Sequence, residues 1–196
     1  IRNGESPFSD TPWCDPLAQR LSSDKVADVE QLADEVGVMM GQLDALPFWQ
    51  IALVLQAHQA QRLGLRPEYG IDWQLLQAAK QCACKVLELE GAGQQIALLH
   101  TLPDNGLPLL DDTLTHWRTN AQLLQRMVSW WLQTPPREQD PTLPNTFGIQ
   151  LYDVLMNQRN ILWRDYLLAL PPGRYVVAVG ALHLYGEGNL PGLLRE

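Results

Sequence analysis

The sequence predicts an α/β fold that is rich in helix and contains a small, mostly parallel sheet. Apolar residues recur at helical spacing over most of the chain, and residues 85–90 and 174–182 have the composition of strands. A helical pattern precedes each of these two runs, as in αβ units. Of the 196 residues, 46% are hydrophobic and 18% charged, which is typical of globular proteins. We therefore expect a single domain over residues 1–196, with long amphipathic helices packed on the sheet.

Two helices are expected in the first third of the chain. The first spans residues 23–40, where apolar residues are spaced by three and four positions after a start signal at Ser23 and Asp24. The second begins after Pro47 and ends near Gly64, because proline is favoured at the start of a helix and glycine at its end.

Three further helices are expected. Within residues 66–81, Asp72 lies at an N-cap position, and the apolar residues after it form one buried face. A long amphipathic helix is expected over residues 110–131 and a last helix over residues 146–170. Four prolines between residues 133 and 145 predict a surface loop that separates these two helices.

The two strand candidates differ in length. Residues 174–182 form an almost continuous apolar run with β-branched residues, typical of a strand covered on both faces, whereas residues 85–90 are shorter and end at Gly91. Two strands do not form a stable sheet in water, so we expect the other strands upstream of Ile1 or from a second copy of the chain. We also expect a homo-oligomer, because exposed strand edges favour pairing between chains.

Charge, hydropathy and cysteine content argue against several classes of protein. The net charge is −8 and the 14 basic residues are scattered, which argues against nucleic acid as the main partner. No apolar run approaches the ~20 residues that a membrane span needs. The three cysteines cannot all pair within one chain, and free thiols favour a cytoplasmic location. The first residues, IRNGESPFSD, resemble neither a signal peptide nor a natural start, so a periplasmic location stays open.

His183 follows the second strand candidate and precedes the segment LYGEGNLPGLL, in which Glu187 is a candidate binding residue. We expect His183 at the carboxyl end of the strand, where ligands bind in open α/β sheets. An imidazole at that edge can ligate a metal or act as a general base. The alternative is a histidine that only closes a turn.

Glu90 ends the first strand candidate, so it could face the same sheet edge as His183. A carboxylate beside a histidine suits a divalent metal or an acid/base pair. The alternative is a solvated charge at the end of a strand.

Arg159 is the most unusual residue of the last predicted helix, because it falls on an apolar stripe at helical spacing. A guanidinium directed into a core must be paired, since burying an unpaired charge is costly. We expect its partner to be a carboxylate at the sheet edge or a bound anion, as a structural ion pair or a direct substrate contact. Asn160 is either a binding residue or an ordinary exposed helix residue.

Several short motifs resemble, in order, those of the TraB/PrgY/GumN family, relatives of the Tiki metalloproteases. Each motif is weak alone, but together they cover essentially the whole chain. The sequence is similar to that of an uncharacterised enterobacterial member, although Gly91 replaces a threonine of the family pattern. The motifs are Trp49 within a helix, Gly70 to Asp72, Leu89 and Glu90 with Gln95, Arg159 and Asn160, and Gly180 with His183.

The resemblance implies a metal-dependent hydrolase, with peptides as one class of substrate and small molecules as another. His183 and Glu90 would bind Mn²⁺, Co²⁺ or Zn²⁺ or act on water, and Arg159 would orient a carboxylate or stabilise an oxyanion. The family's first Gly-x-x-His motif and its N-terminal strands lie outside this sequence, so we expect the isolated chain to be inactive. The same fold is implied for erythromycin esterases and a haem-binding lipoprotein group, so it does not fix the reaction. By resemblance the candidate binding residues also include Asp72, Gln95 and Gly180.

A non-catalytic protein that binds or sequesters a peptide or another ligand is the alternative function. The observation behind it is the tryptophan-rich helical layer, which could line an apolar groove. Affinity for peptides that survives removal of every metal, without turnover, would favour this alternative.

Overall fold

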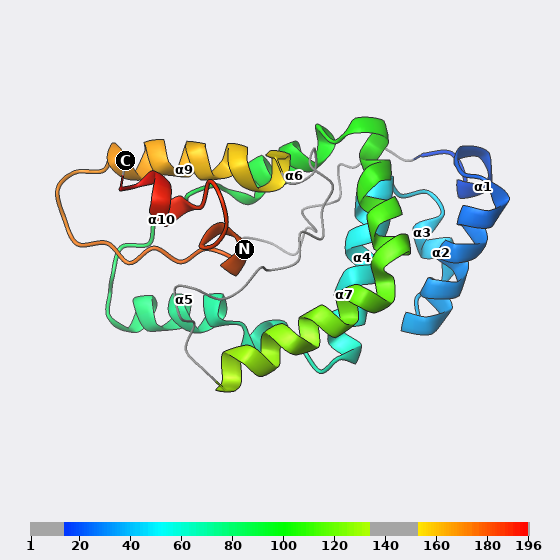
Figure 1. Cartoon of the computed structure of the whole chain (residues 1–196), viewed down its shortest axis with the longest axis horizontal. Helices are drawn as coiled ribbons and strands as arrows, with labels where there is room; N and C mark the ends of the chain where they lie inside the picture. Colours follow the sequence, from blue (N-terminus) through cyan, green and yellow to red (C-terminus); the bar gives the residue numbers. More distant parts are fainter. Residues whose placement is uncertain (1–13, 134–152, 196) are drawn as a thin grey trace. The chain divides into compact units, whose positions relative to one another are not determined.

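The computed structural model describes residues 14–133 and 153–195, and most of these residues are helical (Figure 1). The loop predicted between residues 133 and 145, and the first residues of the helix predicted over 146–170, lie almost wholly outside this part of the chain. The chain forms two compact units: unit 1 comprises Ile1–Leu65 and Ala92–Val128, and unit 2 comprises Arg66–Gly91 and Ser129–Glu196.

Unit 1 has a helical core in which α2 (Ser23–Val36) packs against α4 (Phe48–Arg62). Val29, Ile51, Leu55 and Leu110 are fully buried there, and each such side chain contributes about 1.5–3 kcal/mol relative to an exposed one. The helices predicted over residues 23–40 and from Pro47 to Gly64 correspond to α2 and α4. The elements of unit 1 are α1 (Leu17–Arg20), α2 (Ser23–Val36), α3 (Met40–Leu43), α4 (Phe48–Arg62), α6 (Ala92–His100), the 3₁₀ turn η2 (Pro103–Gly106) and most of α7 (Leu107–Gln133).

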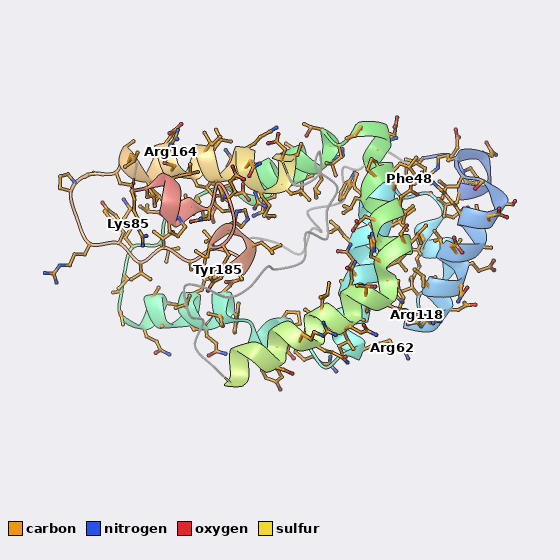
Figure 2. The ribbon with its side chains drawn as sticks, viewed as in Figure 1. Phe48, Arg62, Lys85, Arg118, Arg164 and Tyr185 are labelled. Carbon is orange, nitrogen blue, oxygen red and sulfur yellow. The ribbon has the colours of Figure 1, made fainter. Side chains whose placement is uncertain are left out.

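Arg20 at the end of α1 ties that short helix to the start of α4. Its Nη2 donates hydrogen bonds to the carbonyls of Asp44 and Leu46, at 2.8 and 3.0 Å. Its guanidinium carbon lies 4.8 Å from the centre of the ring of Phe48, the first residue of α4. Phe48 is labelled in Figure 2. A cation over an aromatic face is attracted to it, so the two elements are joined by polar and apolar contacts.

Gly106 allows the turn before α7 to approach α4 closely. Its φ of +83° lies in the left-handed region that glycine favours. A Cβ atom at this position would lie 2.4 Å from the Cβ of Trp49 and 2.8 Å from the Trp49 backbone nitrogen. Trp49, one of the family motif positions, is 1% exposed and is therefore a core residue of unit 1.

Unit 2 is built around α9 (Gln158–Leu168), which packs against α10 (Leu190–Leu193) and continues directly from a π-helical turn, η3 (Asp153–Asn157). The helix predicted within residues 66–81 exists, but none of its residues is buried. It begins at Ile71 after the N-cap Gly70, so Asp72 is in the first turn rather than at the cap. The elements of unit 2 are the 3₁₀ turn η1 (Pro67–Tyr69), α5 (Ile71–Gln81), η3 (Asp153–Asn157), α9 (Gln158–Leu168), the 3₁₀ turn η4 (Ala181–His183) and α10 (Leu190–Leu193).

The prediction of an α/β fold with a small parallel sheet is wrong, because the described residues contain helices and no strand. Residues 84–88 and 174–180 have no regular secondary structure, and no backbone hydrogen bond joins the two segments. An extended segment becomes a strand only by such pairing, which a local apolar pattern cannot supply. The apolar run was expected to be covered on both faces, yet Val176 is 92% exposed. Residues 181 and 182 belong to the η4 turn.

Unit 2 exposes many apolar side chains and buries few of them. Its buried apolar residues, within the described ranges, are Met156, Trp163 and Leu190. Large apolar side chains that unit 2 exposes are Tyr69, Ile71, Trp73, Leu75, Leu76, Val86, Leu87, Ile161, Leu162, Tyr166, Leu168, Tyr175, Val176, Val177, Leu184 and Leu194. Exposed apolar surfaces commonly mark interaction sites, and self-association of the chain stays a prediction.

The helices of the described residues include no candidate for a membrane span.

Candidate functional site

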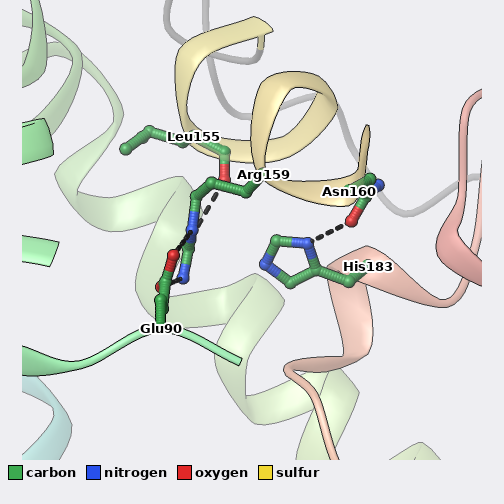
Figure 3. Close-up of polar contacts among 5 residues, drawn as sticks. All are labelled: Glu90, Leu155, Arg159, Asn160 and His183. Carbon is green, nitrogen blue, oxygen red and sulfur yellow. Dashed lines mark hydrogen bonds and ion pairs between the residues drawn. The ribbon is translucent and has the colours of Figure 1, made fainter. Parts of the chain in front are cut away.

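Glu90, Arg159, Asn160 and His183 lie together in unit 2 (Figure 3), and we call these four residues the polar cluster. His183 is the last residue of η4, where its backbone N–H donates to the carbonyl of Gly180 at 2.9 Å. Although it lies in a turn, its side chain is directed inward and the residue is only 4% exposed. A histidine that merely closed a turn would not require this burial.

Arg159 is paired with Glu90 through both carboxylate oxygens. Its Nε donates to Oε2 at 3.2 Å, and its Nη2 donates to Oε1. Its Nη1 donates to the carbonyl of Leu155, one turn earlier, at 3.1 Å. The two charged side chains are 18% and 14% exposed, so the pair is largely withdrawn from water. This geometry makes the guanidinium's partner a carboxylate, one of the two partners expected from its place on the apolar stripe.

Asn160 contacts His183 from the position next to Arg159 on α9. Its Oδ1 lies 2.7 Å from Nδ1 of His183, and its Nδ2 donates to the carbonyl of Gly188 at 2.8 Å. Asn160 is 2% exposed and is not the ordinary exposed residue that the sequence left open. Successive residues of a helix point about 100° apart, so α9 directs one side chain to Glu90 and the next to His183.

Trp163 packs against two residues of the polar cluster, His183 and Arg159. Its ring centre lies 4.4 Å from that of His183, and the guanidinium carbon of Arg159 lies 4.7 Å from the ring centre of Trp163. The tryptophan is 5% exposed and covers the imidazole with hydrocarbon. It follows Arg159 by one helical turn, so the two side chains share a face of α9.

The pKa of His183 is lowered from 6.5 to about 4, which keeps the imidazole neutral at physiological pH. Burial is the largest cause, because it disfavours the charged ring. The positive charge of Arg159 lowers the pKa further, and the negative charge of Glu90 opposes it. A neutral imidazole can accept a proton or bind a metal through whichever ring nitrogen is unprotonated.

Among the other predicted site residues, Gly180 bonds to the polar cluster through its backbone carbonyl, which accepts from the N–H of His183 at 2.9 Å. Gly180 caps the turn that carries His183, whereas Glu187 and Asp72 are exposed side chains of unit 2. Gln95 is an exposed residue of α6 in unit 1 and is not placed relative to the cluster.

Three residues that contact the polar cluster were not candidates from the sequence. Trp163 follows Arg159 by four positions, and this spacing was the signal that the two side chains could touch. Leu155 and Gly188 each contribute a backbone carbonyl, for which no residue type is diagnostic.

The described residues do not by themselves provide a metal centre. No group of three or more His, Cys, Asp and Glu side chains that could hold a metal occurs among them. Both oxygens of Glu90 bond to Arg159. Of the two predicted metal ligands, Glu90 and His183, this leaves His183. A divalent metal at His183 would need ligands from outside the described part of the chain, and the metal stays a prediction.

Comparison with known sequences assigns the chain to a family. Residues 13–196 match the family model of the TraB/PrgY/gumN family, and the chain belongs to this family. The resemblance stated from the sequence motifs is thereby confirmed.

Two curated relatives are similar over the whole chain. Each is an "Uncharacterized protein YbaP", one from Escherichia coli (strain K12) and one from Shigella flexneri, and each is 61% identical over 195 residues. The match covers 100% of this chain and 74% of each relative, and these relatives are enterobacterial, as expected from the sequence. No solved structure matches the chain.

Proposed function

We propose that the chain is part of a hydrolase whose reaction centre is the polar cluster. The observation that supports this proposal is a buried, neutral imidazole next to a guanidinium that a carboxylate holds in place. Buried titratable groups with strongly shifted pKa values and specific charged neighbours are concentrated at functional sites. Membership of the TraB/PrgY/gumN family is compatible with the proposal, because this family resembles the Tiki metalloproteases.

In this proposal His183 accepts the proton of an attacking water molecule. A pKa near 4 leaves the ring unprotonated at neutral pH but makes it a weak base, so its contribution comes from position more than from basicity. The neutral ring is also the form that binds a divalent metal. Such a metal would supply Lewis acidity.

Arg159 is proposed to stabilise the negative charge that develops on the substrate. Three of its N–H groups bond to Glu90 and Leu155, and no hydrogen bond within the described residues uses the remaining two. A preorganised donor of this kind is worth about 10²–10³ in rate at an oxyanion. Glu90 has the role of orienting Arg159, because both of its oxygens are occupied by that pair.

The alternative function is that of a non-catalytic peptide-binding protein whose tryptophans line an apolar groove. The burial of the tryptophans does not favour it. Trp49, Trp117 and Trp163 are at most 5% exposed, so they pack in cores and do not line an open groove. Trp73 is about half exposed. Peptide binding therefore remains the second hypothesis for function.

The proposed function is tested by assaying peptide and ester hydrolysis with the whole polypeptide in which this chain occurs. Assays with added Mn²⁺, Co²⁺ or Zn²⁺, and with a chelator, establish whether a metal is needed. His183→Gln is expected to reduce the rate by about 10²–10⁴-fold. His116→Gln is the matched control, because His116 is a half-exposed residue of α7. Equal rates for the wild type and His183→Gln would refute the proposal.

A further inference from the structure

Nδ1 of His183 faces a hydrogen-bond acceptor whose orientation is fixed by a second bond. An asparagine amide has a carbonyl oxygen that accepts and an NH₂ group that donates. The Nδ2 of Asn160 donates to the carbonyl of Gly188 at 2.8 Å, which places Oδ1 against Nδ1 of His183 at 2.7 Å.

The opposite orientation of the amide is excluded by its partners. If the amide were rotated, its oxygen would face the carbonyl oxygen of Gly188, and two acceptors would be opposed at 2.8 Å in a partly buried place. Two buried acceptors without a proton between them lose a hydrogen bond and repel each other. The observed orientation is therefore the one that satisfies all three groups.

We infer that Asn160 is a positioning residue that holds His183 in the tautomer protonated on Nδ1, so that Nε2 is the nitrogen available for chemistry. An oxygen facing Nδ1 can only accept, so the proton of the ring must be on Nδ1. No hydrogen bond between described residues uses Nε2. In Figure 3 this nitrogen is directed away from Asn160, toward the side on which Arg159 and Glu90 lie.

With the proton on Nδ1, the unprotonated Nε2 lies on the side of the ring where the charged side chains of Arg159 and Glu90 are found. Helix α9 supplies both Asn160, which orients the ring, and Arg159, whose guanidinium lies near it. Water or a substrate group bound at Nε2 would thus lie next to an arginine that Glu90 anchors. The catalytic role of Nε2 rests on the proposed function. The tautomer of His183, in contrast, can be measured without an activity assay.

The test is a long-range ¹H–¹⁵N correlation spectrum of the full chain with ¹⁵N-labelled histidine at neutral pH. The signals of His183 are identified by their absence in His183→Gln. The wild type is expected to show a protonated Nδ1 and an unprotonated Nε2. Asn160→Asp keeps an acceptor oxygen against Nδ1 and is expected to keep that pattern, at a cost in stability because its second oxygen faces the carbonyl of Gly188. Asn160→Leu is expected to populate the tautomer protonated on Nε2.

Asn157→Ala is the matched control, because Asn157 lies three residues before Asn160 and bonds to Asp153 instead. It is expected to leave the spectrum of His183 unchanged. A wild-type ring protonated on Nε2, or a folded Asn160→Leu that keeps the proton on Nδ1, would overturn the inference. If Asn160→Leu does not fold, the wild-type and Asn160→Asp spectra test the inference, and a ring protonated on Nε2 in either protein would overturn it. An Nδ1-protonated ring in a protein without hydrolytic activity would count against the proposed function alone.

Discussion

Arg159 binds both carboxylate oxygens of Glu90, a residue 69 positions earlier in the sequence. The pair joins α9 to the segment just before α6, and it lies beside the imidazole whose pKa it shifts. It is therefore both a structural link in unit 2 and the electrostatic setting of His183.

Glu90→Gln is expected to lower the free energy of unfolding by about 2–4 kcal/mol, because it leaves a largely buried guanidinium without its charge partner. Chemical denaturation measures this change. Asp111→Asn is the control: it breaks the ion pair between Lys25 and Asp111, whose side chains are 39% and 40% exposed, and is expected to cost less than about 1 kcal/mol. Equal costs for the two variants would show that burial of the Arg159–Glu90 pair is unimportant.

The folded state is expected to lose stability as the pH falls from about 6.5 to about 4. In this window the unfolded chain protonates His183 while the folded chain does not, so acid favours unfolding. A pKa difference of this size corresponds to a loss of roughly 3 kcal/mol in the free energy of unfolding. The loss is complete once the pH lies below the pKa of His183 in the folded state. Denaturation of the wild type and His183→Gln across this range measures the difference. Identical pH profiles for the two proteins would contradict the shifted pKa.

Trp163→Ala is expected to destabilise unit 2 by about 3–5 kcal/mol, because it removes a buried ring that contacts both Arg159 and His183. Thermal or chemical unfolding measures the loss. Trp73→Ala is the comparison, since Trp73 is 52% exposed and its removal should cost far less. A small effect at Trp163 would mean that the polar cluster does not depend on this ring.

Gly106→Ala is expected to destabilise unit 1 by about 2–5 kcal/mol, since it combines a left-handed backbone with a clash against Trp49. Gly37→Ala separates the two effects. Gly37 has a φ of +76° but no atom within 4 Å of the added Cβ, so about 1–2 kcal/mol is expected there. Denaturation curves for both variants make the comparison, and equal losses would argue against the close approach at Trp49.

Local patterns predicted the helices better than they predicted the sheet. Period and end signals located α2 and α4, because helix hydrogen bonds form within a segment. Residues 174–182 have the composition of a strand, but a strand also needs a partner that the segment itself cannot specify. The described residues supply no such partner, and most of this run has no regular secondary structure.

The polar cluster was predictable in part. Arg159 on an apolar stripe implied a buried partner, and Glu90 was a candidate because it ended the first strand candidate and could face the same sheet edge as His183. The bond between Asn160 and His183 spans 23 positions and depends on the path of the turn at Gly188, which no motif encodes. Sequence reasoning thus found the charged residues and left the tautomer of the imidazole to the structure.

The most direct test of the central claim is an NMR titration of the His183 ring. The claim is that a neutral, buried imidazole lies under the influence of Arg159. The titration midpoint is expected near pH 4 in the wild type and at a higher pH in Arg159→Gln, because a neighbouring positive charge has been removed. A midpoint near 6.5 that Arg159→Gln leaves unchanged would contradict the account.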